Sequence, residues 1–255
     1  MTADQYPYAA SSTSLEATLL PSWARAGGRS ALKQRLDDPE QAAKIRRDVK
    51  KELESSGGIQ IAAYEPRQAW AGKSLDEIDN AESLDMVDVV LTIERNGGAS
   101  VVNFGMNEED VRMAMKLPWV ATASDGSAKL PSSVIPHPRS FGTFPRKIGH
   151  YAIEEGTLAL EAAIRSATSL PADILGISDR GRLLPGMVAD IVVFDPKNFR
   201  DLATYSQPFL PTTGLKHVCI AGSFAVYEGI PTGALLGKSI RKTHCISKRY
   251  SSARQ

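Results

Sequence analysis

The sequence has few cysteines, almost no net charge and no long apolar run. Its 255 residues include only two cysteines, Cys219 and Cys245, which are not at metal-ligand spacing. Thirty basic and twenty-nine acidic residues give a formal net charge of +1, which argues against a general nucleic-acid or membrane-surface partner. No apolar stretch could span a bilayer, and the first residues lack the basic and apolar regions of a signal peptide. These absences predict a soluble, cytoplasmic protein with reduced thiols.

Local signals define several helices. Asp38 fits an N-cap with Pro39 at the first helical position, which predicts a helix to about Glu54. Basic and acidic residues alternate along it, so we expect a solvated face, not a nucleic-acid site. Ser74 and Glu77 fit a capping box that opens another helix. Further helices are expected over 85–94, 107–115, 146–155, 158–167 and 171–176.

Strands are expected where β-forming residues run between turn signals. The segment 19–28 is expected to be a loop. The order of strand 100–104, helix 107–115 and strand 119–123 predicts a βαβ unit and therefore a parallel sheet. The other expected strands are 4–8, 59–64, 189–194 and the hairpin of 217–221 with 224–227.

An acid followed by a glycine ends one of these strands. The run 119–123 leads into Ser124-Asp125-Gly126. Barrel enzymes present catalytic carboxylates in this way, at the carboxyl end of a strand. The same tripeptide is also ordinary turn chemistry, so by itself it does not decide between a site and a turn.

Three motifs in order place this tripeptide in a wider pattern. They are Asp-Gln-Tyr-Pro-Tyr at 4–8, Ser-Asp-Gly at 124–126 with His-Pro-Arg-Ser-Phe-Gly-Thr-Phe-Pro-Arg at 137–146, and Ala-Asp-Ile-Val-Val-Phe-Asp-Pro at 189–196. With these motifs the chain resembles, from Met1 to about Lys242, the C-terminal part of an N-acyl-D-amino-acid deacylase. This is the D-aminoacylase branch of the amidohydrolase superfamily. The resemblance implies zinc-dependent hydrolysis of the linear amide bond of small-molecule N-acyl-D-amino acids.

The resemblance also implies an α/β fold. Residues 1–172 would form the C-terminal part of a TIM barrel, with an inserted helical subdomain at about 20–85. Residues 173–242 would form part of a β-sandwich, and 243–255 a flexible tail. A complete barrel takes about 250 residues, yet only three or four barrel strands are found here. We therefore expect the family's first half to be encoded upstream of Met1, and this chain to be inactive alone.

Four residues match the family's substrate and catalytic positions. By resemblance, Asp125 is the general base and a metal neighbour, and Arg139 holds the free carboxylate of the substrate. Ser12 would be the second carboxylate contact, while Tyr6, or alternatively Tyr8, would polarise the amide oxygen. A guanidinium suits a carboxylate because its fork binds both oxygens. A structural salt bridge is the other interpretation of Arg139, and the loop 127–136 is a few residues longer than in the family.

Metal ligands are scarce. A catalytic zinc takes about three protein ligands and activates a water. The superfamily's early His-x-His motif does not occur in this chain. His137 belongs to the substrate-loop motif, His150 and His217 are expected to be structural, and His244 is given no role. The resemblance thus implies a Zn²⁺ cofactor in a complete enzyme, with Asp125 as the one ligand from this chain.

Two other functions remain open. One is a non-catalytic remnant, or half of a two-chain assembly, that binds acylated amino acids. The other is a related amidohydrolase that acts on a ring amide. Arg139 and Ser12 argue against the ring amide, because they would hold the free carboxylate of a linear substrate. No motif specifies the acyl group, the side-chain preference or an oligomeric state.

Overall fold

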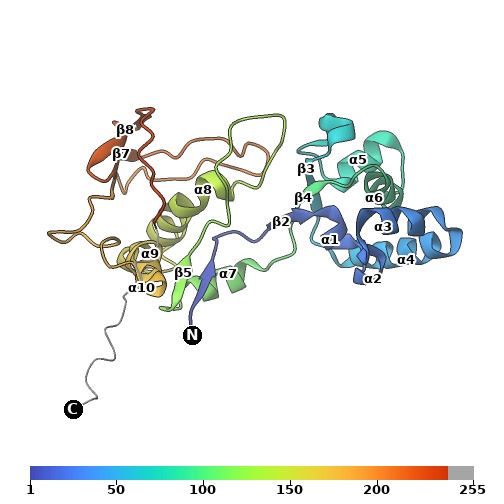
Figure 1. Cartoon of the computed structure of the whole chain (residues 1–255), viewed down its shortest axis with the longest axis horizontal. Coiled ribbons are helices and arrows are strands. Elements are labelled where there is room, and N and C mark those ends of the chain that lie inside the picture. The colour runs from blue at the N-terminus through green and yellow to red at the C-terminus, as the bar shows by residue number, and fades with distance from the viewer. Residues whose placement is uncertain (241–255) are drawn as a thin grey trace, which may run out of the picture.

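The computed structural model describes residues 1–240 as a protein of mixed helix and sheet with three separate sheets (Figure 1). A lobe of helices lies at one end, and the N-terminal strand lies in the other part of the molecule, from which the chain leads into the lobe. The elements in chain order are β1 (Ala3–Gln5), β2 (Ser11–Ser14), α1 (Leu15–Leu19), α2 (Ser22–Arg25), α3 (Gly28–Asp37), α4 (Pro39–Ser55), β3 (Ile59–Ala63), η1 (Glu65–Trp70), α5 (Leu75–Glu82), α6 (Met86–Arg95), β4 (Ser100–Asn103), α7 (Glu108–Met115), β5 (Val120–Thr122), α8 (Arg139–Pro145), η2 (Arg146–Glu154), α9 (Leu160–Ala167), α10 (Ser169–Leu175), β6 (Ile191–Phe194), β7 (Leu215–Ile220), β8 (Ser223–Tyr227) and β9 (Ile230–Pro231). The segment 243–255, expected to be a tail, lies outside the described residues.

The helical lobe has its own hydrophobic core. Helices α1 to α6 pack with the antiparallel sheet β2-β4-β3 around one cluster of buried residues, which includes Ile45, Val49, Ile93 and Val101. These four side chains are fully buried. Apolar spacing along α4 and α6 turns one face of each helix into this core, as amphipathic helices require. The loop expected over 19–28 is wrong in part, because α2 and the start of α3 lie within it.

The predicted helix caps are confirmed. The Asp38 side chain accepts a 2.8 Å hydrogen bond from the Gln41 backbone at the start of α4. In α5, the Ser74 hydroxyl accepts from the Glu77 backbone at 3.1 Å, while the Glu77 carboxylate accepts from the Ser74 backbone at 2.7 Å. Both caps satisfy backbone N–H groups that have no partner within the helix, so local sequence alone fixes these boundaries.

Removal of the α4 cap tests how far it stabilises the lobe. We expect Asp38→Ala to lower the free energy of unfolding by about 1 kcal/mol, because the Gln41 N–H loses its acceptor. Asp38→Asn keeps an oxygen at this place and should change it by less than half as much. Urea denaturation of the two variants measures the difference, and equal losses would contradict a capping role.

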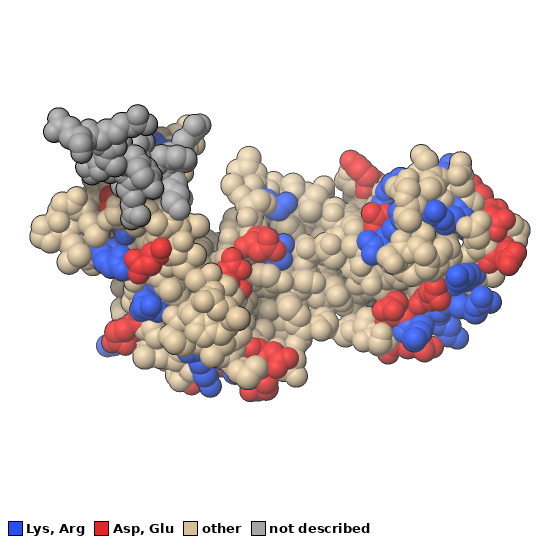
Figure 2. All heavy atoms as spheres, turned by 60° about the horizontal axis from the view of Figure 1, so that its bottom comes forward, with Lys and Arg blue, Asp and Glu red and all other residues tan. Residues whose placement is uncertain are grey.

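The charge distribution on the lobe matches the solvated faces expected from the sequence. Figure 2 shows basic and acidic side chains interleaved over the helical end of the molecule. Several form ion pairs, such as Arg46 with Asp88 at 2.5 Å and Arg67 with Glu82 at 2.6 Å. Within the described part of the chain, no helix combines the length and apolarity needed to cross a bilayer.

The predicted βαβ unit is wrong. Strand β4 pairs antiparallel with β2 and β3, whereas β5 pairs with β1 in a different sheet. Val101 and Val102 of β4 are both fully buried, as in a central strand of a parallel sheet. Two adjacent buried valines are therefore compatible with a parallel and with an antiparallel sheet, and only the long-range strand pairing distinguishes the two.

Strands β1 and β5 form the parallel pair that positions the candidate site. Their register places Asp4 opposite Ala121, and the Ala123 N–H continues it by donating to the Gln5 carbonyl at 3.0 Å. Both chains therefore leave the pair at the same edge. The same part of the molecule contains the helices α7, α8, η2, α9 and α10 (Figure 1).

The C-terminal sheet, β6-β7-β8-β9, is antiparallel throughout. The expected hairpin is confirmed: β7 and β8 meet across Ala221 and Gly222, which both have positive φ, at 50° and 82°. None of its strand residues is fully buried, and Val192 and Phe224 are 56% and 44% exposed. This sheet is compatible with the β-sandwich portion expected there, whose bounds stay a prediction.

Candidate functional site

Asp125 and Tyr6 lie where the parallel strands end. Tyr6 directly follows β1, and Asp125 follows β5 after a two-residue step. Asp125 has φ of +46°, in the left-handed region that short polar residues tolerate better than most. Gly126 allows a close approach, since a Cβ there would lie 2.9 Å from the Ser140 Cα. The backbone is thus turned to hold the Asp125 carboxylate beside α8.

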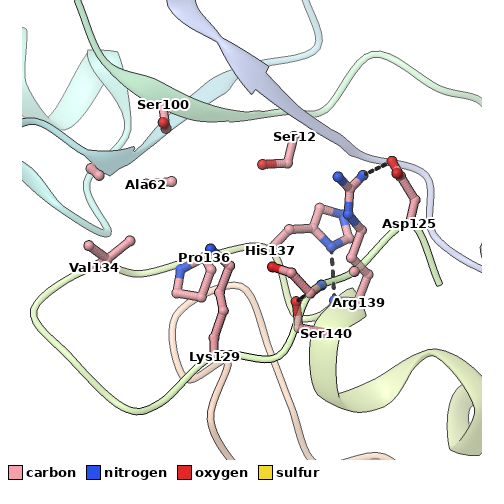
Figure 3. A pocket seen from close by; sticks show the side chains of 13 residues that line it. Ser12, Ala62, Ser100, Asp125, Lys129, Val134, Pro136, His137, Arg139 and Ser140 are labelled. Atoms are coloured by element: carbon pink, nitrogen blue, oxygen red, sulfur yellow. Dashed lines mark hydrogen bonds and ion pairs between the residues drawn. The ribbon is translucent and has the colours of Figure 1, made fainter. Parts of the chain in front are cut away.

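Arg139 is the first residue of α8 and reaches back to Asp125. Its Nη1 lies 3.0 Å from the Asp125 Oδ2 (Figure 3). Its guanidinium lies 5.1 Å from the centre of the Tyr6 ring. The arginine side chain is 13% exposed, whereas that of Asp125 is 67% exposed. The cation therefore sits on an aromatic face with its carboxylate partner at the solvent side.

His137 is buried next to Arg139 and holds the backbone of that residue in place. It is 2% exposed; its Nδ1 accepts the Arg139 backbone N–H at 3.0 Å, and its Nε2 is 2.9 Å from the Ala10 carbonyl. Because Nδ1 accepts, the ring is neutral and Nε2 carries the hydrogen that is donated to Ala10. Burial lowers the pKa of His137 to about 4, which keeps this form at neutral pH. The Tyr8 and Tyr205 rings pack edge-on against the imidazole.

Ser12 belongs to the antiparallel sheet β2-β4-β3 of the helical lobe. It lies on β2 and lines, with Arg139 and Asp125, a cavity of about 200 Å³, hereafter the Arg139 cavity (Figure 3). The residues that line this cavity are small or polar: Ser12, Ala62, Ala63, Ser100, Asp125, Gly126, Ser127, Lys129, Val134, Pro136, His137, Arg139 and Ser140. The structure thus brings Ser12, Asp125 and Arg139 to one cavity.

Tyr6 and Tyr8 have different surroundings. Burial, more than any charge, raises the pKa of Tyr6, and Arg139 opposes this while Asp125 adds to it. Its hydroxyl therefore keeps its proton at neutral pH and can donate. Tyr8 is 2% exposed, lies against Gly142 and carries Arg146 over its ring at 5.1 Å. The geometry places Tyr6 at the Arg139–Asp125 pair and Tyr8 in the packing behind it.

A second cavity, of about 380 Å³, is also lined by Asp125. Tyr6, Tyr8 and Ala123 line it, together with Met106 and others. Asp125 lines both cavities, so its carboxylate stands at their common edge. A group bound in either cavity would meet this acid.

The described residues do not form a zinc site. Across residues 1–240, no cluster of three or more His, Cys, Asp or Glu side chains is placed to hold a metal ion. His150 contacts Glu154 and Glu155 at 3.2 and 3.1 Å, and His217 contacts Glu228 at 3.5 Å, away from Asp125. The two nitrogens of His137 are already occupied. The expected metal role of Asp125 thus finds no cluster of partner ligands among residues 1–240 and stays a prediction.

Two residues of the Arg139 cavity were not predicted from the sequence. Lys129 lines the Arg139 cavity, and the Ser140 hydroxyl accepts from the Ser127 N–H at 3.3 Å. Both depend on how the loop 127–136 folds back, which no local pattern specifies. The one signal available was the extra length of this loop.

Comparisons with known proteins agree on one family. The model of the "Amidohydrolase family" matches residues 38–226. An N-acyl-D-glutamate deacylase of Alcaligenes xylosoxydans xylosoxydans is 36% identical over 189 residues, which are 74% of this chain and 37% of that protein. A D-aminoacylase of the same organism is 35% identical over 188 residues, 74% of this chain and 38% of that protein.

Solved structures give a similar result. A D-aminoacylase crystal structure aligns with a TM-score of 0.69 and 30% identity, over 92% of this chain and 41% of that one. An N-acyl-D-glutamate deacylase from Bordetella bronchiseptica, complexed with zinc and a phosphonate inhibitor, aligns with a TM-score of 0.67 and 30% identity, over 90% and 41%. The chain thus spans about two fifths of the length of these relatives.

Proposed function

Because the chain belongs to the amidohydrolase family, we propose that it contributes the substrate-carboxylate site of an enzyme that hydrolyses N-acyl-D-amino acids to a carboxylate and a D-amino acid. The observation that carries this proposal is the contact of Arg139 with Asp125 at 3.0 Å, beside Ser12 in one cavity. The names of the Alcaligenes and Bordetella relatives support the substrate class.

Arg139 would bind the free carboxylate of the substrate. Its guanidinium is 13% exposed and rests on the Tyr6 ring, so its direction is fixed before a ligand arrives. The substrate carboxylate would take the place that the Asp125 carboxylate holds in the free chain, with the Ser12 hydroxyl as a further donor. A fork that makes two charge-assisted hydrogen bonds gives both affinity and orientation.

Asp125 would then act as the general base. Released from Arg139 and largely exposed, its carboxylate can take a proton from the attacking water and pass it to the departing amine. Tyr6, whose pKa is raised, would donate to the amide oxygen, where negative charge develops in the transition state. These roles need an acid, a cation and a phenol on one side of the substrate.

Zinc belongs to this proposal only as a property of a completed site. The Bordetella relative is complexed with zinc, yet the described residues of this chain supply one candidate ligand, which is too few to fit a catalytic zinc. We therefore derive no step through a metal. The TIM-barrel assignment of residues 1–172 is proposed on the same resemblance.

A binding function without hydrolysis is the second candidate. It is favoured by the lack of a three-ligand cluster in residues 1–240, and it would use the same Arg139 contact. The chain would then bind acylated amino acids as a remnant or as half of a two-chain assembly.

Calorimetric titration of the 255-residue chain tests the site that both functions share. We expect N-acetyl-D-alanine to bind at least about ten-fold more tightly than N-acetyl-D-alaninamide, because the amide lacks the charge that Arg139 recognises. N-acetyl-L-alanine in the same series measures the handedness of the site. Circular dichroism of the same samples serves as the control that the chain is folded. Equal affinity for acid and amide, or no binding by folded chain, would overturn the proposal.

A further inference from the structure

The motif at 137–146 ends in a second arginine, Arg146, which the proposed function does not use. Its Nε donates a 3.0 Å hydrogen bond to the carbonyl of Pro7, the residue after Tyr6. Its guanidinium also lies 5.1 Å from the centre of the Tyr8 ring. Arg146 therefore contacts both the backbone and a side chain of the turn that follows β1.

One helical face aligns the two arginines of the motif with this turn. Arg139, Gly142 and Arg146 are three and four residues apart where α8 continues into η2, so they share one face. Arg139 lies over the Tyr6 ring and Arg146 over the Tyr8 ring, each at 5.1 Å. Gly142 lets the second ring come close, since a Cβ there would lie 2.5 Å from the Tyr8 hydroxyl oxygen. The two arginines thus contact the two aromatic rings of the turn.

Further partners fix the direction of the Arg146 guanidinium. Its Nη1 lies 3.4 Å from Oδ2 of Asp201, whose side chain is 6% exposed. The centre of the Tyr151 ring lies 5.5 Å from the same guanidinium. A planar guanidinium presents its donors in fixed directions, so Arg146 can serve the Pro7 carbonyl and the Asp201 carboxylate together. A lysine would keep the charge without this geometry.

The bond to Pro7 lies at the centre of a tight turn. The Tyr8 N–H donates to the Tyr6 carbonyl at 3.1 Å, which closes a three-residue turn around Pro7. A bond from Arg146 to the middle of this turn restricts the backbone on both sides of it. A shift of the turn would move the Tyr6 hydroxyl relative to Asp125.

We propose that Arg146 is a positioning residue of this site, which holds the Pro7 carbonyl and thereby directs the Tyr6 hydroxyl toward the amide oxygen of the substrate. This inference rests on the proposed function, which gives Tyr6 its role at that oxygen. The two arginines of the motif then have different tasks. Arg139 binds the carboxylate of the substrate, whereas Arg146 acts through the turn.

Tyrosine NMR of the free chain tests the hold of Arg146 on the turn. The chain is labelled at the phenol Cζ of its seven tyrosines, and the Tyr6 signal is identified by its loss in Tyr6→Phe. Burial raises the pKa of Tyr6 in the native chain. We expect Arg146→Lys to release the turn, expose the ring and lower this pKa toward its ordinary value of about 10. Asp201→Asn, which removes the charged partner of Arg146 but not its bond to Pro7, should leave the pKa unchanged.

A matched ligand pair tests the effect on the amide. N-acetyl-D-alanine and its thioacetyl counterpart differ in one atom, and sulfur accepts hydrogen bonds more weakly than oxygen. We expect the native chain to bind the oxygen ligand about 5-fold more tightly, the effect of one hydrogen bond between neutral groups. Arg146→Lys should reduce this preference to below about 2-fold and keep the preference for acid over amide, which depends on Arg139. Asp201→Asn should keep both preferences.

The inference is overturned if the Tyr6 pKa in Arg146→Lys equals the native value, or if it moves equally far in Asp201→Asn. It is also overturned if the oxygen preference survives in Arg146→Lys. The same preference in Tyr6→Phe would show that another group binds the amide oxygen, which overturns the aim of Tyr6 as well. Failure of the folded native chain to bind either ligand would instead overturn the proposed function, whereas a lowered Tyr6 pKa in Arg146→Lys would still support the hold of Arg146 on the turn.

Discussion

Arg139→Ala is expected to lower the affinity of the chain for N-acetyl-D-alanine about 30-fold. Removal of one partner of a shielded, hydrogen-bonded charge pair costs about 2 kcal/mol or more, and 1.4 kcal/mol corresponds to a factor of ten. The Arg139 side chain is 13% exposed and fixed on the Tyr6 ring, so little of this interaction is lost to solvent. Arg139→Lys keeps the charge without the two-pronged geometry and should fall between alanine and the native chain.

Two further variants separate this effect from a general disturbance. Arg182 forms an ion pair with Asp173 at 2.7 Å, so Arg182→Ala removes a more exposed arginine pair outside the cavity and should leave affinity unchanged. Asp125→Asn should act in the opposite direction and tighten carboxylate binding a few-fold, because the internal competitor for Arg139 loses its charge. Calorimetry measures all the variants. Native affinity in Arg139→Ala would show that another cation holds the carboxylate.

Local chemistry made some of the fold predictable. The caps of α4 and α5 depend on residues three apart, Asp38 with Gln41 and Ser74 with Glu77, and both are confirmed. The family resemblance is confirmed by the match of the amidohydrolase model to residues 38–226. These features share one property: their evidence lies within short segments or fixed motifs.

Features that depend on long-range contacts were missed. Strand β4 was assigned to a parallel sheet, because its buried valines suit either sheet and its true partners, β2 and β3, lie far away in sequence. Helix α8 is absent from the expected helices, since Pro138 precedes its seven residues and Pro145 is the last of them, which hides any periodicity.

In the candidate site, too, the residues were predictable from local motifs, whereas their contacts were not. Motif positions named Tyr6, Ser12, Asp125 and Arg139, and the structure brings them close together, although their roles stay a prediction. The motifs did not indicate that Asp125 and Arg139 pair with each other in the free chain. That contact requires the positive φ of Asp125 and the start of α8 at Arg139, which arise only once the loop between them has folded.

His137 is expected to make the stability of this site depend on pH. Burial lowers its pKa to about 4 in the folded chain, against about 6.5 when unfolded. Between these values the unfolded state binds more protons, so the contribution of His137 to stability is complete above about pH 6.5 and is lost as the pH falls toward 4. From pH 7 to pH 5 the loss should amount to about 2 kcal/mol.

Comparison with His137→Asn isolates this contribution. Glu94, whose pKa burial raises to about 7, changes stability in the opposite direction over the same range, so the native chain alone would show a mixture. The asparagine variant keeps Glu94 and loses the imidazole with its packing against Tyr8, so it should be less stable at pH 7. Its unfolded state has no imidazole at position 137 to take up a proton, so its stability lacks this loss, and the difference between the two chains should narrow by about 2 kcal/mol at pH 5. Urea denaturation at both values measures this. A constant difference would mean that His137 is not held neutral, and that the Arg139 backbone is positioned by other contacts.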